Sequence, residues 1–302
     1  MKKWMKRVAY AVGSLVGLVI VGLATIYGLS EARFRKTYLV PTETVAVSSD
    51  SATLERGKHL ATAIAKCTEC HGERLEGRAV IDAPPMGRVV ALNLTSGEGG
   101  IGAQLTPADI ERAIRHGVGR NGRGLLIMPA NDYQYMTDDD LRAIVSYVKQ
   151  APAVNNVLAP SRLMMLPRAL MVFGQLPVLT AEEIVKSAVK PMTMAAGPTV
   201  EYGGYIAMVG GCKGCHGPNL SGGKIAAGDP AWPPSANLTR EGNIGRWTEE
   251  QFVQVLRSGA RPDGSKLNDA MPWKLAGQMT DVEMHALYTY LRSVPPRAFG
   301  NH

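Results

Sequence analysis

The chain has 302 residues, of which 45% are apolar and 20% charged, and its formal net charge at pH 7 is +7. This length is typical of two domains of ordinary size. Residues 1–36 hold seven of the 33 basic residues and one of the 26 acidic residues, which leaves the remainder close to neutral, with 26 basic and 25 acidic residues. The composition therefore excludes a basic nucleic-acid-binding surface, and we expect no nucleic-acid partner.

An uncharged apolar stretch occupies residues 8–29 and reads VAYAVGSLVGLVIVGLATIYGL. A helix of this length crosses a bilayer. A cleavable signal peptide has a shorter apolar region, roughly 7–15 residues, and a small-residue cleavage site. The sequence SEARFRK after this stretch is a poor site of that kind. We therefore predict a single-pass transmembrane helix, which contacts lipid through residues 8–29, within a retained membrane anchor at 1–36. Cleavage of this segment is the alternative.

All four cysteines lie in two copies of one pentapeptide, CTECH at 67–71 and CKGCH at 212–216. Disulfide frameworks are typical of smaller domains, and the cysteine pairs of one zinc site usually lie roughly 15–20 residues apart. Neither requires a histidine after each second cysteine. Covalent haem does, because two cysteines bond its vinyl groups and the adjacent imidazole ligates the iron. We predict two covalently attached haem c groups, held by Cys67, Cys70, His71, Cys212, Cys215 and His216.

The sequence around the two motifs repeats. ERGKHLATAIAKCTECHG from Glu55 matches EYGGYIAMVGGCKGCHG from Glu201, and MTDDDLRAIVSYVKQAP from Met136 matches MTDVEMHALYTYLRSVPP from Met279. The offset stays between 142 and 146 residues, so one fold is used twice. We predict an anchor at 1–36, a linker at 37–53, a first domain at 54–152, an interdomain segment at 153–198, a second domain at 199–298 and a tail at 299–302.

Each repeat is predicted to be mainly α-helical. Helix-start signals stand at four threonines, each with an acidic or amide residue three positions later: Thr106, Thr137, Thr248 and Thr280. Gly57 and Gly203, in the helix that leads to each cysteine motif, are predicted points of close packing. The period-2 alternation of strands is missing, and the Gly- and Pro-rich stretch 72–105 is predicted to form loops.

The interdomain segment contains the apolar run LMMLPRALMVFGQLPVL at residues 163–179. One interpretation is a linker that packs back on both domains. The other is a Met-rich surface that contacts a membrane or a partner subunit. Both remain open at this point.

A second axial ligand to each iron is expected, and a methionine thioether suits an electron-transfer haem. Among the 14 methionines, only Met128 and Met271 occupy equivalent repeat positions followed by proline. They lie 58 and 56 residues beyond Cys70 and Cys215. The proline favours an extended backbone before it, which directs the sulfur toward the iron. We predict that His71 with Met128, and His216 with Met271, ligate the two irons.

Several other residues have two interpretations each. The equivalent arginines Arg115 and Arg257 either pair with a haem propionate or lie on a solvated helix face. Trp247 and Trp273 are both candidates to donate an indole N–H to a propionate, with core packing as the alternative for each. His59 aligns with Tyr205, which favours a packing position over a ligand.

The proximal histidines also need an orienting acceptor. The proline pairs at 84–85 and 233–234 are candidates for supplying a backbone carbonyl to each imidazole.

The run NLTREGNIGRWTEEQFVQVLRSGARPDGSKLNDAMPW, with MTDVEMHALYTYLRSVPP after it, resembles the cytochrome c subunits of bacterial membrane-bound alcohol, aldehyde and gluconate dehydrogenases. The resemblance covers residues 54–297. It implies two tandem class I cytochrome c domains, with His71 and His216 proximal to iron and Met128 and Met271 distal. Members of that family typically carry three haem motifs, whereas this chain has two.

The resemblance implies electron transfer from a quinone or a partner dehydrogenase toward a respiratory chain. The expected partner is a membrane-bound redox complex: a dehydrogenase, an oxidase, a quinol-oxidising complex or a photosynthetic reaction centre. Two expectations result: an anchored dihaem electron carrier that is not itself an enzyme, or an integral electron-transfer subunit of a larger complex. A dihaem peroxidase or thiosulfate-oxidising enzyme is a third option, but the matched methionines disfavour it because such enzymes need an open iron site. Attachment of c-type haem resembles periplasmic chemistry in bacteria, so we expect a bacterial inner-membrane protein with both haem domains in the periplasm.

Overall fold

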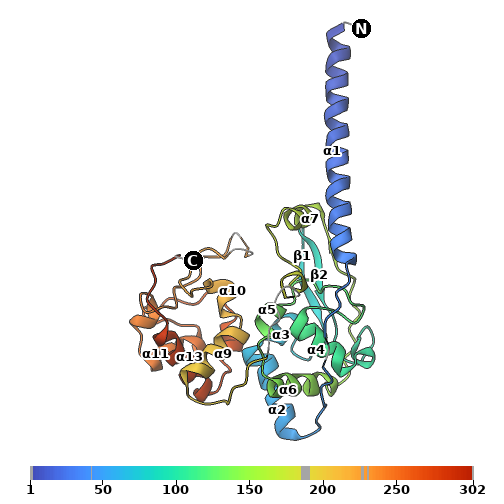
Figure 1. Cartoon of the computed structure of the whole chain (residues 1–302). Helices are drawn as coiled ribbons and strands as arrows, with labels where there is room; N and C mark the ends of the chain where they lie inside the picture. Colours follow the sequence, from blue (N-terminus) through green and yellow to red (C-terminus); the bar gives the residue numbers. More distant parts are fainter. Residues whose placement is uncertain (1–2, 42, 185–190, 226–227, 230, 301–302) are drawn as a thin grey trace.

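The computed structural model describes residues 3–41, 43–184, 191–225, 228–229 and 231–300. A long helix projects from a globular part that has two helical lobes, one for each sequence repeat (Figure 1). The expected mainly α-helical class is confirmed.

The anchor segment and first repeat contain the helices α1 (Lys3–Arg35), α2 (Ser51–His59), α3 (Cys67–His71), α4 (Pro107–His116), α5 (Ala130–Tyr133) and α6 (Asp138–Lys149), the π-helix η1 (Leu60–Ile64), the 3₁₀-helix η2 (Gly102–Gln104) and the strands β1 (Arg78–Ala83) and β2 (Gly87–Ala91). The interdomain segment contains β3 (Arg162–Leu163), α7 (Met165–Val172) and α8 (Ala181–Ile184). The second repeat contains α9 (Val200–Val209), α10 (Cys212–His216), α11 (Glu249–Ser258), α12 (Trp273–Ala276), α13 (Asp281–Ser293) and the 3₁₀-helix η3 (Asn243–Gly245).

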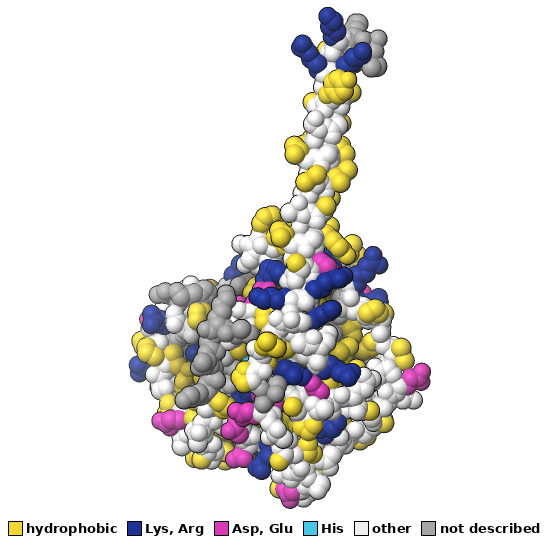
Figure 2. All heavy atoms as spheres, turned by 45° about the vertical axis from the view of Figure 1, so that its right-hand side comes forward, with side chains coloured by type: hydrophobic (Ala, Val, Ile, Leu, Met, Phe, Trp, Pro, Cys, Tyr) yellow, Lys and Arg dark blue, Asp and Glu magenta, His cyan; other side chains and the backbone are white. Residues whose placement is uncertain are grey.

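Helix α1 is long and apolar enough to cross a membrane. Its most apolar window of 18 residues has a mean hydropathy of 2.1, and none of that window is buried against the rest of the chain. Apolar side chains cover the helix, and Lys and Arg side chains gather at its outer end and where it joins the globular part (Figure 2). A helix of this kind near the N-terminus is either a membrane anchor or a signal sequence.

The predicted helix starts are confirmed at all four threonines. Capping boxes close the N-termini of α4, α11 and α13, and the Thr137 side chain accepts from the backbone N–H of Asp140 at the start of α6. Asp140 does not complete the box, because its carboxylate is used elsewhere, in the interface between the repeats. Local sequence therefore sets where these helices begin. Tertiary contacts decide whether the acidic or amide side chain three positions after the threonine completes the capping box.

Each repeat is organised around a helix crossing at a glycine. A Cβ atom on Gly57 would lie 2.0 Å from the carbonyl oxygen of Ala143 in α6, and one on Gly203 would lie 1.9 Å from that of Ala286 in α13. No side chain fits at these distances, so α2 and α9 approach the last helix of their repeats backbone to backbone. The predicted close packing at both glycines is confirmed.

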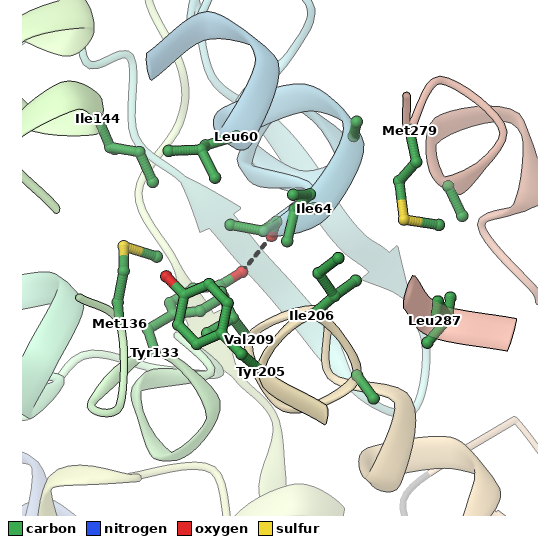
Figure 3. Packing of buried hydrophobic residues seen from close by; sticks show 14 of the residues in the cluster. Leu60, Ile64, Tyr133, Met136, Ile144, Tyr205, Ile206, Val209, Met279 and Leu287 are labelled. Atoms are coloured by element: carbon green, nitrogen blue, oxygen red, sulfur yellow. Dashed lines mark hydrogen bonds between the residues drawn. The ribbon is translucent and has the colours of Figure 1, made fainter. Parts of the chain in front are cut away.

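The two repeats share one hydrophobic core. Leu60 and Ile64 of the first repeat lie in the same buried cluster as Ile206 and Leu287 of the second (Figure 3). Helix α5 of the first repeat contacts α9 of the second, and α12 of the second contacts η1 of the first. Because core residues of both repeats pack together, the two halves form one globular unit, and the exact domain boundaries remain a prediction.

The expectation of loops alone between the first motif and α4 is wrong. Strands β1 and β2 form an antiparallel hairpin, and β2 also pairs with β3 from the interdomain segment. Gly87 has a φ of +94°, and a Cβ there would lie 2.2 Å from the carbonyl oxygen of Arg162. The hairpin thus draws the interdomain segment onto the first repeat, in part through a close backbone approach that only glycine allows.

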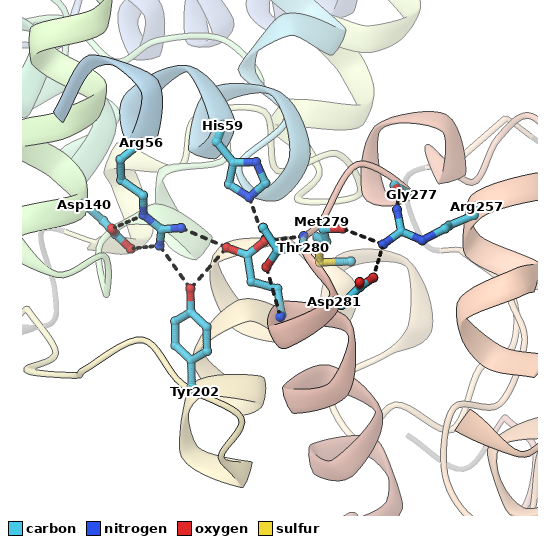
Figure 4. A network of polar contacts seen from close by, with 10 residues as sticks. Arg56, His59, Asp140, Tyr202, Arg257, Gly277, Met279, Thr280 and Asp281 are labelled. Atoms are coloured by element: carbon cyan, nitrogen blue, oxygen red, sulfur yellow. Dashed lines mark hydrogen bonds and ion pairs between the residues drawn. The ribbon is translucent and has the colours of Figure 1, made fainter. Parts of the chain in front are cut away.

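A buried polar network joins the repeats (Figure 4). Arg56 of α2 binds the Asp140 carboxylate in its own repeat, at 3.0 Å from Nε to Oδ1, and the Glu283 carboxylate of the other repeat, at 2.8 Å from Nη1 to Oε1. His59 lies 2.6 Å from the second oxygen of Glu283. The second repeat contacts the first in the same way, because the hydroxyl of Tyr205 in α9 donates to the carboxylate of Asp140 in α6 at 2.7 Å.

This network has approximate two-fold symmetry. His59 and Tyr205 are equivalent positions of the repeat, and so are their acceptors Glu283 and Asp140. Each leading helix therefore places one side chain against the acidic N-terminal turn of the other repeat's last helix. The assignment of His59 as an aromatic-type packing position is refined by this contact: it is a polar interface residue.

Substitution of Glu283 tests how much this interface stabilises the protein. Burial opposes ionisation of the Glu283 carboxyl, but hydrogen bonds from His59, the Thr280 N–H and Arg56 outweigh burial and lower its pKa to about 2. Its contribution is therefore full above the ordinary pKa of 4.5 and is lost as pH falls toward 2. We expect Glu283→Gln to lower the free energy of unfolding at pH 7 by on the order of 3 kcal/mol. The free energy of unfolding of this variant should also depend less on pH than that of the parent protein.

The matched control is Asp281→Asn, because this first-turn carboxylate of the same helix has a side chain that is 94% exposed. Surface ion pairs contribute roughly 0–1 kcal/mol, so the control should resemble the parent protein in denaturant titrations between pH 2 and 7. Equal unfolding free energies for Glu283→Gln and the control at pH 7 would show that the network does not stabilise the fold.

Candidate haem-attachment sites

Each cysteine motif forms a single helical turn with the same flanking backbone. Helices α3 and α10 are preceded by left-handed residues, Lys66 with φ of 52° and Gly211 with φ of 68°. After them come glycines with φ of 82° and 81°. A helical turn places residues i, i+3 and i+4 on one face. Both cysteines and the histidine of each motif are therefore presented together.

The histidine of each cysteine motif is oriented by a backbone carbonyl. His71 Nδ1 lies 2.9 Å from the carbonyl oxygen of Leu92, and His216 Nδ1 lies 2.7 Å from that of Ala236. A carbonyl only accepts, so Nδ1 carries the proton and Nε2 keeps a free lone pair, as an iron ligand requires. Burial lowers the pKa of both imidazoles, which favours this neutral form. The proposal that the proline pairs supply these carbonyls is wrong.

The orienting carbonyls belong to a repeated element that sequence reasoning missed. Leu92 and Ala236 each precede the tripeptide Asn-Leu-Thr. In both copies the asparagine side chain accepts from the threonine N–H two residues on, at 2.9 Å for Asn93 and 2.8 Å for Asn237. These turns hold the carbonyls in place. The exact repetition of NLT was the available signal, because an asparagine two residues before a threonine suits such a local turn.

The four cysteines are unpaired, and burial raises the pKa of each thiol, to about 12 for Cys67. In the described residues, no group of three or more His, Cys, Asp or Glu side chains is arranged to hold a metal ion. Neither a disulfide nor a four-cysteine zinc site is therefore seen in this part of the chain. Covalent attachment to haem c fits the donor set, because it uses neutral thiols and leaves each imidazole as the ligand.

The two Met-Pro dipeptides have matching backbone geometry. Pro129 and Pro272 have φ, ψ angles of −81°, 54° and −77°, 51°, and each begins a short helix, α5 or α12. Met128 and Met271 are half-buried and pack against the same shared core as Cys67 and Cys212. Their role as distal ligands stays a prediction, and the equivalent local geometry supports it.

The side chains of Arg115 and Arg257 each bind a backbone carbonyl and a carboxylate of their own repeat. Arg115 donates to the Met136 carbonyl at 2.9 Å and binds Asp138 at 2.6 Å. Arg257 donates to the Met279 carbonyl at 3.2 Å and binds Asp281 at 2.7 Å. Both tie α4 or α11 to the turn before the last helix. The guanidinium groups therefore have a structural role in each repeat, and their pairing with a haem propionate stays a prediction.

Trp273 is better suited to bind a cofactor. Its indole Nε1 is buried and has no hydrogen-bond partner among the described residues. Buried indole N–H groups normally have an acceptor. A haem propionate of the second repeat would supply that acceptor. This orphaned donor is a further indication that the second site fits haem c.

The two motifs meet at the interface between the repeats. The Lys66 ammonium, directly before CTECH, donates to the Ile64 carbonyl at 2.9 Å and to the Gly210 carbonyl, two residues before CKGCH, at 2.6 Å. Burial raises the pKa of Asp132 to about 6 in the same region, and Lys66 partly opposes the shift. The two attachment sites are therefore neighbours held by a direct cross-repeat contact.

Both halves of the chain match cytochrome c families. The family described as cytochrome c oxidase, cbb3-type, subunit III matches residues 52–148, and the family described as cytochrome c matches residues 200–295. Together with the two attachment motifs, these matches define a protein with two cytochrome c domains, each of which carries one covalently bound haem c.

Over most of its length, the chain is similar to proteins named as cytochrome subunits of dehydrogenases. It is 29% identical over 278 residues to the fructose dehydrogenase cytochrome subunit of Gluconobacter japonicus, covering 85% of this chain and 56% of that protein. It is 28% identical over 276 residues to the alcohol dehydrogenase (quinone) cytochrome c subunit of Gluconacetobacter polyoxogenes, covering 82% and 57%. It is 29% identical over 268 residues to the gluconate 2-dehydrogenase cytochrome c subunit of Pantoea cypripedii, covering 79% and 56%. The chain thus spans little more than half the length of these relatives.

Removal of one cysteine pair should remove one haem and leave the other. In Cys212→Ala/Cys215→Ala, we expect covalently bound haem, measured as pyridine haemochrome after denaturation, to fall by half. The Cys67→Ala/Cys70→Ala variant should give the same loss through the other site. Retention of the full haem content in either variant would contradict the assignment of one haem to each motif.

Proposed function

We propose that this chain is a membrane-anchored dihaem electron-transfer subunit of a membrane-bound dehydrogenase. The observation that carries the proposal is the presence of two equivalent attachment sites, each with its own histidine and matched methionine, which meet at one interface. The three relatives, all named as cytochrome subunits of dehydrogenases, support the same assignment. The chain would carry electrons and leave substrate oxidation to a partner subunit.

In this proposal, the first haem is held by Cys67, Cys70 and His71 with Met128 as distal ligand. The second is held by Cys212, Cys215 and His216 with Met271. A haem c bound in this way supplies one-electron oxidation and reduction, and methionine ligation raises its reduction potential. The chain's own residues set that potential through ligation, burial and the hydrogen bonds from His71 and His216 to the NLT turns.

We further propose that α1 crosses the bacterial inner membrane and holds both domains on its periplasmic side. The charge-free stretch at residues 8–29 is long enough to span the bilayer. Periplasmic placement is supported by the chemistry of c-type haem attachment. Four basic residues precede the stretch and three follow it, which adds only a slight bias in the same direction.

One observation favours a different partner. The first repeat matches a family described as a cbb3-type oxidase subunit, whereas the second matches cytochrome c in general. An electron path that ends in a terminal oxidase would use the same two sites. The identity of the complex therefore decides between a dehydrogenase and an oxidase, while the electron-transfer role is common to both.

Replacement of a distal methionine tests the proposed ligands. Met128→His and Met271→His should each lower one of the two reduction potentials, by on the order of 100 mV, because histidine does not raise the potential as the thioether does. Potentials are read from a spectroelectrochemical titration of the full chain. Met86→His, in the turn between β1 and β2, is the matched control and should change neither potential. Unchanged potentials in either test variant would refute that ligand.

Isolation of the native complex tests the partner. The chain, extracted from its own membranes in mild detergent, should elute with a dehydrogenase whose substrate reduces both haems anaerobically. The same substrate should not reduce the haems once the chain is separated from that subunit. Elution with an oxidase would favour the second partner. Elution of the chain alone, with its haems neither reduced through a dehydrogenase nor oxidised through an oxidase, would contradict a subunit role.

A further inference from the structure

Helix α7 is fixed at one height along α1. The guanidinium carbon of Arg168 lies 4.5 Å from the ring centroid of Tyr27 and 5.1 Å from that of Phe34, and its Nη1 donates to Ser30 Oγ at 2.8 Å. The charge-free stretch of α1 ends at Leu29. Arg168 therefore contacts α1 where that stretch ends, so α7 lies at the level at which a spanning helix leaves the hydrocarbon.

One face of α7 is apolar and exposed. Leu166 and Phe173 are 44% and 68% exposed, and half-buried Leu170 lies between them at i, i+4, i+7 spacing. Pro167 and Met171 face the protein and are buried. Spacing of this kind places Leu166, Leu170 and Phe173 in one stripe. Among the described residues, nothing covers this stripe.

Basic groups surround the junction of α1 and α7. A shallow groove there is lined by Leu29, Ala32, Val172, Arg33, Arg35 and Lys36. Arg33 pairs with Glu182, and Arg35 pairs with Glu31 at 2.9 Å. Among the described residues, no carboxylate is paired with Lys36, whose ammonium lies 5.1 Å from the Tyr38 ring. An apolar stripe beside basic side chains suits the boundary between acyl chains and anionic headgroups.

We propose that α7 is a second membrane contact, lying in the headgroup region of the bilayer with Leu166, Leu170 and Phe173 turned toward the acyl chains. An interfacial helix gains stability from buried apolar area and from attraction of basic groups to anionic lipids. The bilayer is the occupant because the stripe is continuous with the anchor and lies at the depth where the anchor emerges.

This contact would fix the orientation of the first repeat relative to the membrane. Strand β3 directly precedes α7 and pairs with β2, and the Met164 N–H donates to the Met86 carbonyl at 3.2 Å. Arg33 also donates to the Met171 carbonyl and binds Glu182 beyond α7. The first repeat is thus attached to the membrane at two points, α1 and α7, and does not swing freely on a single helix.

Depth measurement with nitroxide labels tests this proposal. The haem-loaded full chain, whose native cysteines are taken up in haem attachment, receives one new cysteine at a time: Leu166→Cys, Phe173→Cys, Leu18→Cys in the anchor, or Val282→Cys in the second repeat. Each labelled chain is placed in nanodiscs of phosphatidylcholine and phosphatidylglycerol. Collision of the label with oxygen, which partitions into lipid, is compared with collision with a water-soluble nickel chelate by power-saturation EPR.

We expect the labels at 166 and 173 to favour oxygen over nickel by at least several-fold relative to the label at 282, and to lie shallower than the label at 18. The proposal rests on α1 crossing the membrane, which the label at 18 tests separately. If the label at 18 is in lipid but those at 166 and 173 match the label at 282, the α7 contact is refuted. If the label at 18 is also in water, the membrane-spanning anchor itself is refuted. Unchanged haem spectra and haem content confirm the fold of each variant.

Discussion

In each repeat, the helix that leads to the cysteine motif touches the last helix through bare backbone, at Gly57 on Ala143 and at Gly203 on Ala286. This crossing positions both the cysteine motif and the contact surface of its repeat. It directs α2, through η1, to the first motif, and α9 directly to the second. It also brings residues next to the glycines into contact with the other repeat, as Arg56 contacts Glu283. A close helix crossing inside each repeat thereby determines how the two repeats meet.

The interface that results brings the two attachment sites together. The network around Arg56 and Glu283 stabilises one part of this interface. The hydrogen bond from Lys66 to the Gly210 carbonyl stabilises the part that lies between the two motifs. Burial of charged groups is costly unless they are paired, and here each carboxylate of the network has a cationic or hydroxyl partner. The fused repeat is therefore suited to keep two redox groups at a constant separation.

Features that depend on local patterns can be predicted from this sequence. The cysteine motifs, the threonine caps and the glycine crossings are of this kind, because each is visible within a few residues or by alignment of the repeats. The hairpin β1–β2 escapes prediction because β1 is mostly exposed and β2 is half-buried along its length, so neither strand alternates between exposed and buried residues. Part of its pairing also comes from Arg162, about seventy residues away. The contact of His59 with Glu283 escapes it for a similar reason, since 224 residues separate the partners.

The central claim is that each repeat closes its own iron site with a histidine and a methionine, so that the chain carries electrons and does not transform a substrate. Addition of carbon monoxide to the fully reduced, membrane-inserted chain at neutral pH tests this claim most directly. We predict an unchanged absorption spectrum, because Met128 and Met271 as distal ligands would leave carbon monoxide no open position on either iron. Formation of a carbon monoxide adduct at either site would contradict the claim and would point to an enzyme with an open iron.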